Sequence, residues 1–220
     1  MRILLLSVFA AAAMLAQDLP ADINRESFSR LPLMKRDQLS GDALRAYDVV
    51  LGKDAAGNPK PVPSLGPAAT SLYSMGVAVP LDQLNKYVRT IKVGTAMYQL
   101  CSIIAAREFD EPYEWSSHEA AALRAGISAK TVEAIKLDGD VSGAPEKEAL
   151  VVHFFRALLR DHKVSSELYA QVVKEFGQEG MFELTSAMGD YAMVAMMLRA
   201  VDQHWPSGPV DLPAIKRLAR

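Results

Sequence analysis

The sequence predicts an all-α protein whose helices form one domain. Apolar residues recur with helical spacing over almost the whole chain from Ala68 onward. No segment shows the sustained period-two alternation with β-branched residues that is typical of strands. Half of the 220 residues are hydrophobic, which is enough for one substantial core. The expected helices span about 41–51, 68–78, 81–92, 94–108, 112–125, 129–137, 145–162, 166–176 and 180–203.

Several of these helices have end residues that typically mark a boundary. Ser128 and Ser165 stand where an N-cap is expected, and a serine hydroxyl there accepts a hydrogen bond from a free backbone N–H. Gly126 and Gly177 follow two other helices, where glycine tolerates the left-handed conformation that ends a helix. The boundaries of the central helices are therefore predicted from local chemistry as well as from periodicity.

The first residues, MRILLLSVFAAAAMLAQ, resemble a secretory signal. Arg2 supplies the positive charge, an apolar stretch follows, and cleavage fits after Ala16 or after Ala13. We therefore expect a signal peptide at 1–16 and an exported protein, periplasmic or secreted, without stable membrane insertion after processing. A retained anchor is the alternative, although the segment is short for a membrane span.

The remaining chain divides into three parts by composition. We expect an N-terminal arm, a helix and a loop over 17–66, a helical domain over 67–205 and a C-terminal tail over 206–220. The loop GKDAAGNPKPVPSLGP, at 52–67, is long for a compact domain, which suggests a functional role.

Charge and cysteine content exclude two classes of function. The formal net charge is −2 and no basic stripe is present, so nucleic acid is not an expected partner. Cys101 is the single cysteine, so neither an internal disulfide nor a dithiol redox site can form. Cys101 lies on an apolar helix face and is expected to be a buried, inert thiol. His153, between Val152 and Phe154, is expected to be packed in the core.

The stretch EPYEWSSH concentrates polar and aromatic side chains in the first turns of one predicted helix. Glu114 and His118 are four residues apart and share a helix face, so the carboxylate can orient the imidazole and make it a better base. Glu111 is close in sequence, Tyr113 can donate a hydrogen bond to a substrate oxygen, and Trp115 can form a pocket wall. The positive end of the helix dipole favours an anion here. A site for proton transfer on a small anionic substrate is therefore one interpretation.

A purely structural interpretation stands beside it. Acidic residues in the first turn of a helix are expected from the helix dipole alone, and a Glu–His pair with this spacing is often surface decoration. A metal site would need a third ligand, and the sequence indicates none. The spacing by itself leaves catalysis and structure both open.

The longer segment IAAREFDEPYEWSSHEAAALRAGIS resembles the signature of the carboxymuconolactone decarboxylase family, in which YEW-x-x-H precedes a small-residue helix and a Gly-Ile/Leu-Ser step. The resemblance continues through EKEALVVHFFRALL and the last two helices, and covers about 95–203. It implies an all-α, alkylhydroperoxidase-like bundle without a cofactor or a metal. It also implies a homo-oligomer, a trimer or a multiple of one, and the last helix, apolar almost all round, is consistent with a subunit interface.

The resemblance also implies which branch of the family applies. Thiol peroxidase members carry CxxC followed by a histidine, and their two cysteines match Glu111 and Glu114 when counted from His118. Carboxylates cannot perform that chemistry. The YEW form implies a cofactor-free lyase that acts on a small lactone or oxygenated acid, with His118 as general acid/base. An antioxidant peroxidase that depends on Cys101 and a non-catalytic ligand-binding oligomer remain as alternatives.

One departure from the family pattern bears on the site. Many relatives have an Arg-Glu pair about 14 residues before YEW, and Tyr98 and Gln99 stand there instead. Arg107 does fit the pattern and can hold a substrate carboxylate or pair with Glu108. The predicted catalytic residues are His118 and Glu114, and the predicted substrate-binding residues are Tyr113, Trp115, Arg107, Glu111 and Gln99.

Overall fold

The structure is a computed structural model that describes residues 19–63, 65–207, 210 and 212–215. The predicted signal segment at 1–16 lies outside them. Within the described residues every regular element longer than an isolated bridge is helical, so the predicted all-α class is confirmed. No helix among them is both long and apolar enough to cross a bilayer.

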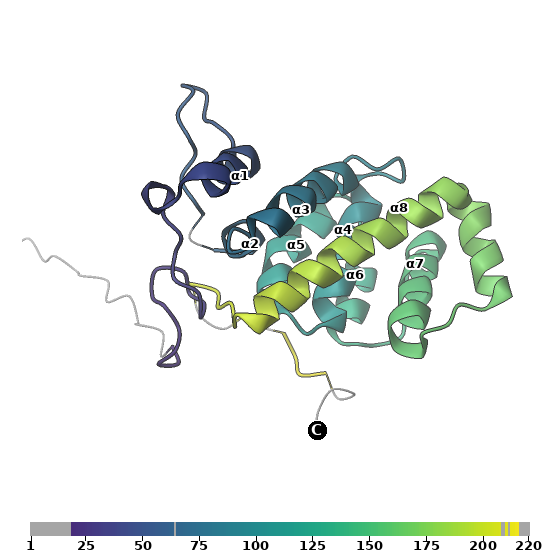
Figure 1. Ribbon diagram of the computed structural model, residues 1–220. Helices are drawn as coiled ribbons and strands as arrows, with labels where there is room; N and C mark the ends of the chain where they lie inside the picture. The colour runs from purple at the N-terminus through teal and green to yellow at the C-terminus, as the bar shows by residue number, and fades with distance from the viewer. Residues whose placement is uncertain (1–18, 64, 208–209, 211, 216–220) are drawn as a thin grey trace, which may run out of the picture.

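The helices from α2 onward follow one another with short connections, whereas a long loop joins α1 to α2 (Figure 1). Their order is η1 (Arg36–Gln38), α1 (Gly41–Leu51), α2 (Pro67–Ser71), α3 (Met75–Val88), α4 (Thr95–Glu108), α5 (Pro112–Arg124), α6 (Ala129–Lys136), α7 (Glu146–Arg156), the π-helical η2 (Ala157–Asp161) and α8 (Ser166–Ala200). Gly177 has φ 72° and ψ 172°, so α8 consists of two helical segments that meet at this residue. The sequence predicted that division from the same glycine.

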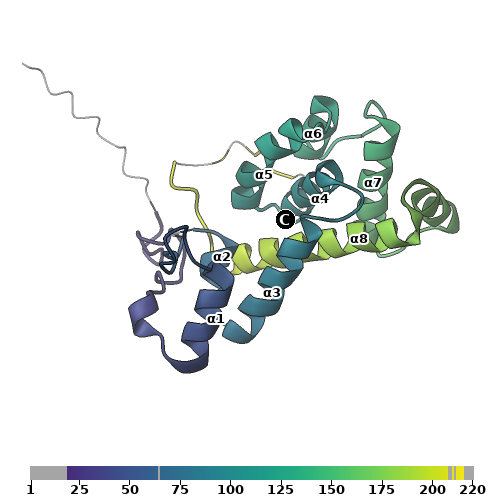
Figure 2. The same ribbon diagram turned by 90° about the horizontal axis from the view of Figure 1, so that it is seen from above.

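Helix α4 is the centre of the bundle. It packs against α5 along one side and against α8 along another, and α3, α6 and α7 also pack around α4 and α8 (Figures 1 and 2). Ten of its fourteen residues are buried, so it has no polar face turned to solvent. Side chains from α4, α5 and α8 therefore meet inside the bundle, and polar residues on these helices face one another rather than water.

The predicted boundary between helices 68–78 and 81–92 is wrong. The chain instead breaks after the short α2, and Pro80 lies inside α3. Proline removes one backbone donor and normally favours a break just before it. Here the break falls earlier, where the Ser74 carbonyl accepts hydrogen bonds from Val77 N and Ala78 N and begins the new helix.

The N-terminal arm and the chain after α8 pack against each other. Arg30 N donates to Val201 O at 2.8 Å, and His204 N donates to Phe28 O at 2.7 Å. The arm includes a turn closed by an isolated bridge between Asn24 and Ser29, so it is less extended than the sequence suggested. These contacts fix the chain beyond α8 close to the first turn of α5.

Candidate functional site

The first turn of α5 is fixed by a buried carboxyl group. Glu111 is the N-cap residue, and its side chain accepts a hydrogen bond from Glu114 N at 2.6 Å. It satisfies one of the backbone donors that a helix start leaves free. Glu111 is 1 % exposed, and this burial raises its pKa to about 8. The predicted substrate-binding role for Glu111 is thus accompanied by a structural one that orients the polar turn.

His118 lies between two polar partners from different helices. Its Nδ1 atom is 2.8 Å from Oε1 of Gln99 on α4, and its Nε2 atom is 3.4 Å from Oε2 of Glu114, one turn earlier on α5. The Glu114 side chain is 3 % exposed, whereas that of His118 is 13 % exposed. The structure thus brings together both predicted catalytic residues and Gln99, and part of the imidazole remains accessible.

The two partners constrain how His118 can carry protons. Both ring nitrogens lie near oxygen atoms that accept hydrogen bonds. A neutral imidazole has one N–H and can satisfy only one of them, whereas an imidazolium donates to both. The orientation of the Gln99 amide therefore sets whether Nδ1 is a donor or an acceptor. This arrangement can hold a proton and release it, which general acid/base chemistry requires.

Two tyrosines that the sequence analysis did not assign to the site border the imidazole. The ring of Tyr191, on α8, is 4.9 Å from the His118 ring in an edge-to-face arrangement, and the Tyr98 ring is 6.3 Å away. Their hydroxyl groups form a short hydrogen bond with each other. Burial raises the pKa of both tyrosines, so both remain neutral phenols at ordinary pH. They form a rigid wall on one side of His118.

A third buried acid, Asp190, precedes Tyr191 on α8 and was also not predicted. Asp190 is 1 % exposed, and its Oδ2 atom accepts a hydrogen bond from Nδ2 of Asn85, on α3, at 2.9 Å. Burial raises the pKa of Asp190 to about 6, and the charge of Glu114 contributes in the same direction. Asp190 is the single charged residue in the stretch 184–198 of α8, which is the sequence signal that marks it.

Tyr113 lies at the outer end of the cluster. Its ring is 5.1 Å from that of Trp205, and it packs against Leu81 and other side chains of a small hydrophobic cluster. Burial raises the pKa of Tyr113 to about 12. Gly66, the end of the long loop, approaches so closely that a Cβ there would lie 2.5 Å from the Tyr113 hydroxyl. This loop therefore contacts one of the predicted substrate-binding residues.

Trp115 belongs to the main hydrophobic core. It has no exposed surface, although its indole Nε1 is buried without a hydrogen-bond partner. Its main visible role is to anchor α5 on the core. The predicted role as a pocket wall is therefore not supported by exposure.

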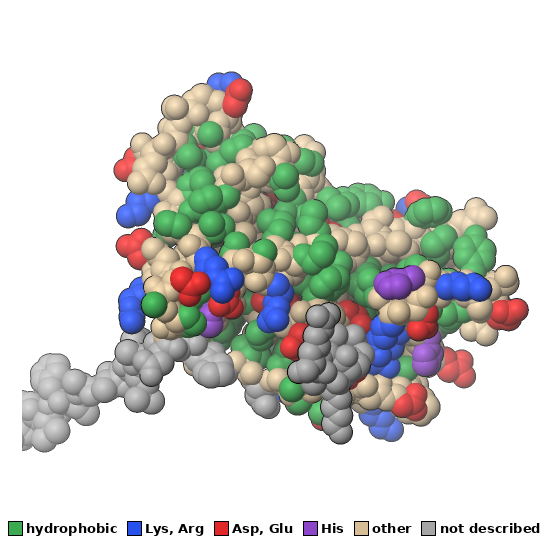
Figure 3. Space-filling view, turned by 60° about the horizontal axis from the view of Figure 1, so that its bottom comes forward, with side chains coloured by type: hydrophobic (Ala, Val, Ile, Leu, Met, Phe, Trp, Pro, Cys, Tyr) green, Lys and Arg blue, Asp and Glu red, His purple; other side chains and the backbone are tan. Residues whose placement is uncertain are grey.

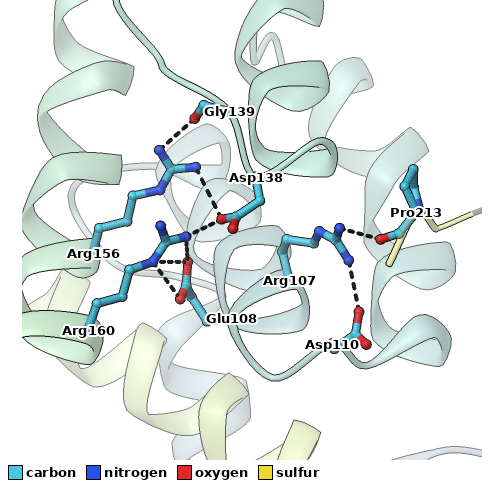
Figure 4. Close-up of polar contacts among 8 residues, drawn as sticks. All are labelled: Arg107, Glu108, Asp110, Asp138, Gly139, Arg156, Arg160 and Pro213. Atoms are coloured by element: carbon cyan, nitrogen blue, oxygen red, sulfur yellow. Dashed lines mark hydrogen bonds and ion pairs between the residues drawn. The ribbon is translucent and has the colours of Figure 1, made fainter. Parts of the chain in front are cut away.

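Arg107 lies outside the His118 cluster, in contrast to the prediction. Its guanidinium donates to Asp110 at 2.8 Å and to the carbonyl oxygen of Pro213 (Figure 4). The neighbouring Glu108 carboxylate accepts hydrogen bonds from Arg160 (Figure 4). Arg107 is eight residues from Gln99 on the same helix, a rise of about 12 Å, which explains the separation.

Two other sequence predictions have definite outcomes. Cys101 is completely buried and burial raises its thiol pKa, which confirms the expected inert environment. His153 is exposed, so its predicted core position is wrong. Helix α7 buries Val151, Val152 and Phe155, and the 100° step per residue then turns His153 to the opposite face. Among the described residues, no three His, Cys, Asp or Glu side chains form a group able to hold a metal ion.

Comparisons with known proteins bear on the fold. No protein-family model matches the sequence, and no curated protein matches it. Among solved structures, the chain is similar to a variant of the debrominase Bmp8 crystallised with 2,3,4-tribromopyrrole. The TM-score is 0.54 at 15 % identity, and the match covers 78 % of this chain and 89 % of that one. At this identity the similarity shows a shared all-α fold and nothing about the reaction.

Fold and site together define an all-α bundle with a polar cluster enclosed by four helices. The cluster draws on α3, α4, α5 and α8 and is centred on a partly accessible histidine. The cluster contains His118, Glu114, Gln99, Tyr98, Tyr191, Asp190 and Asn85.

Proposed function

We propose that this protein is a cofactor-free lyase or isomerase of the carboxymuconolactone decarboxylase type, which acts on a small lactone or oxygenated acid. His118 is its general acid/base and Glu114 orients the imidazole. In a decarboxylation the bond to the carboxyl carbon breaks, CO₂ leaves, and the electron pair is delocalised onto the lactone carbonyl. An imidazolium at His118 then delivers a proton to the carbon atom.

One observation carries this proposal. The His118 imidazole is held from both sides, by Gln99 Oε1 at 2.8 Å and by Glu114 Oε2 at 3.4 Å, yet it retains accessible surface. A fixed, partly accessible imidazole beside a buried carboxylate is the arrangement that general acid/base catalysis uses. Gln99 stands where many members of the family have an acid, and it contacts the histidine directly. It therefore takes the place of that acid, and together with Glu114 it orients the imidazole.

Replacement of His118 by alanine tests the assignment. We expect turnover of a lactone substrate to fall by roughly 10²- to 10⁴-fold, the usual contribution of a positioned acid/base. Ultraviolet absorbance of the purified protein with carboxymuconolactone and related lactones measures this. His153→Ala is the matched control, because His153 is exposed on α7, and its activity should remain within about twofold of the original. Equal turnover in the original protein and in His118→Ala would remove His118 from the mechanism.

A non-catalytic ligand-binding protein is the second candidate, and Gln99 is the observation that favours it. A neutral amide on His118 Nδ1 cannot accept and pass on a proton as a carboxylate does. A Gln99→Glu variant that gains lactone turnover absent from the original protein would support this candidate. A peroxidase is less well supported, because the buried Cys101 has a raised thiol pKa and little thiolate at neutral pH.

We also propose that the protein forms a homo-oligomer through one face of α8. Five residues on this face follow the 4-3-4-3 spacing of a helix–helix seam, namely Phe182, Ser186, Gly189, Met193 and Met196. Phe182 is 67 % exposed and Met196 is 51 % exposed. Hydrophobic side chains gather across the upper part of the face in Figure 3, whereas charged groups lie mainly along its lower edge and ends. Such an apolar area typically marks an interface.

The double substitution Phe182→Asp and Met196→Asp should dissociate the oligomer. Two carboxylates on a buried apolar seam would be desolvated without a partner, which association cannot offset. The mass measured by light scattering coupled to size-exclusion chromatography should change from a multiple of the 24.0 kDa chain mass to that of a single copy. The control is Tyr169→Asp, an exposed aromatic residue on the other segment of α8. A single-copy mass for the unmodified protein would contradict the proposal.

A further inference from the structure

Asp190 is the one carboxyl group of the cluster with an oxygen that no neighbouring group satisfies. It is 1 % exposed, yet its Oδ1 atom has no hydrogen-bond partner, while Oδ2 accepts from Asn85. A buried acceptor without a donor is costly, and native proteins keep such groups mainly where they have a role. Asp190 is adjacent in sequence to Tyr191, whose ring packs on His118. The unsatisfied acceptor thus belongs to the same helix turn as a wall of the site.

A chain of hydrogen bonds that starts at Arg89 determines which oxygen of Asp190 accepts from Asn85. Arg89 Nε donates to Oδ1 of Asn85 at 3.0 Å, and Nδ2 of Asn85 donates to Oδ2 of Asp190 at 2.9 Å. An arginine can only donate, so it holds the oxygen of the Asn85 amide toward itself and the NH₂ group toward Asp190. Asp190 Oδ2 must therefore accept, which leaves Oδ1 as the free position.

The charges around His118 also favour a ligand that donates a hydrogen bond to Asp190. Glu114 and Asp190 are buried acids, and Glu111, with a pKa of about 8, is mostly protonated at neutral pH. Arg107 binds Asp110 and the carbonyl oxygen of Pro213, and the charges of Arg89 and Arg199 act on Asp190 and Glu111. Clustered carboxylates favour a group that donates hydrogen bonds and disfavour another carboxylate. The position next to Asp190 therefore suits a hydrogen-bond donor of the ligand and does not suit its carboxylate.

We propose that Asp190 is a specificity-determining residue of the His118 site, whose Oδ1 accepts a hydrogen bond from a hydroxyl or N–H group of the ligand. This inference rests on the proposed function, because it places the ligand beside His118. It narrows the substrate class to lactones or related small molecules that carry a hydrogen-bond donor. Arg89 and Asn85 act as positioning residues that keep Oδ1 available.

A matched pair of lactones tests this without any turnover. The probes are α-hydroxy-γ-butyrolactone and α-methoxy-γ-butyrolactone, which differ in whether the substituent can donate. Titrations at pH 8 are followed by the nuclear magnetic resonance signals of the His118 imidazole. We expect the hydroxy-lactone to bind about tenfold more tightly, because a hydrogen bond to a charged acceptor at this site is lost in the methoxy compound.

The substitution Asp190→Asn should abolish this preference. The Asn85 amide still presents its NH₂ group, so the new side chain must turn its oxygen toward Asn85 and its own NH₂ group toward the ligand. The hydroxyl oxygen of one lactone and the ether oxygen of the other can then both accept, so the affinity ratio should fall to about one. Because a methyl group's size is the same in both proteins, loss of the preference excludes a steric explanation. Far-ultraviolet circular dichroism and the unfolding midpoint verify that the variant folds.

A second measurement uses the unmodified protein at pH 5. Burial and the charge of Glu114 raise the pKa of Asp190 to about 6, although the hydrogen bond from Asn85 and the charge of Arg89, which follows α3, act in the opposite direction. Below that pH the proton must reside on Oδ1, because Oδ2 accepts from Asn85, so the acceptor becomes a donor. The tenfold preference for the hydroxy-lactone should disappear. The affinity ratio of the two probes at each pH is the measured quantity.

The outcomes separate this inference from the proposed function. The affinity ratio of the two lactones could instead be the same in the original protein and in Asp190→Asn, and at both pH values. That result would overturn the role of Asp190 and leave His118 catalysis intact. If neither lactone perturbed the His118 signals of the original protein, the ligand class would be wrong and both proposals would fall. Loss of the preference both in the variant and at pH 5 supports the inference.

Discussion

Replacement of Glu111 by glutamine is expected to stabilise the protein, and to do so increasingly as the pH rises from 4.5 to 8. Burial raises the pKa of Glu111 from 4.5 to about 8. Between these values the unfolded chain has lost the proton and the folded protein retains it, so the free energy of unfolding falls as pH increases. Glutamine removes this titration, and its amide oxygen can still accept from Glu114 N.

The expected gain is roughly 3 to 5 kcal/mol at pH 8 and close to zero near pH 4.5, since each pH unit in this interval contributes up to about 1.4 kcal/mol. Urea unfolding at pH 5, 6.5 and 8 measures it, provided that the slope with urea concentration is unchanged. The control is Glu133→Gln on the exposed face of α6, where the effect should stay within about 0.5 kcal/mol. Parallel stability curves for Glu111→Gln and the original protein would show that Glu111 is ionised in the folded state.

The pH dependence of Glu111 illustrates which features of the site could be predicted from the sequence and which could not. EPYEW marks a helix start, and the structure begins α5 at Pro112 with Glu111 as the N-cap. That local prediction needed only the neighbouring residues. Whether the cap is charged depends on how deeply the rest of the fold buries it, which is a property of tertiary packing. The sequence therefore predicted the position of the carboxyl group but not its protonation.

The difference between local pattern and tertiary packing also explains which other residues of the site could be predicted. Glu114 and His118 are four residues apart on one helix, so their proximity could be predicted from periodicity alone. Gln99 was placed by the family resemblance, and the structure puts it on the imidazole. Tyr191 and Asp190 reach the site from a helix far away in the sequence, and no local pattern specifies which turn of α8 faces α5.

The outcomes for His153 and Arg107 depend on where a helix places a side chain. His153 was judged by its immediate neighbours, although the helix buries positions three and four residues apart and leaves His153 on the opposite face. Arg107 was assigned by its position in a motif, but about two helical turns separate it from Gln99. Direction around the helix places His153, distance along the helix places Arg107, and residue identity alone predicts neither position.

Substitution of Arg160 by methionine is expected to destabilise the protein by about 3 kcal/mol, in the lower part of the range for breaking a buried ion pair. Arg160 joins Glu108 at the end of α4 to Asp138 after α6 (Figure 4). The side chain of Glu108 is only 6 % exposed and that of Asp138 is 15 % exposed. Methionine retains much of the packing volume but removes the charge, so two largely desolvated carboxylates lose their shared cation.

Chemical denaturation at pH 7 measures this loss, and Arg45→Met provides the matched control. Arg45 also pairs with a carboxylate, Asp42, but its side chain is 71 % exposed and its partner's is 91 % exposed. Exposed pairs of this kind contribute at most about 1 kcal/mol. Adding Glu108→Gln to Arg160→Met should recover part of the loss, because a neutral amide costs less to bury than a carboxylate that has lost Arg160. Equal, small effects for Arg160→Met and Arg45→Met would mean that solvent screens the Arg160 cluster as effectively as it screens the surface.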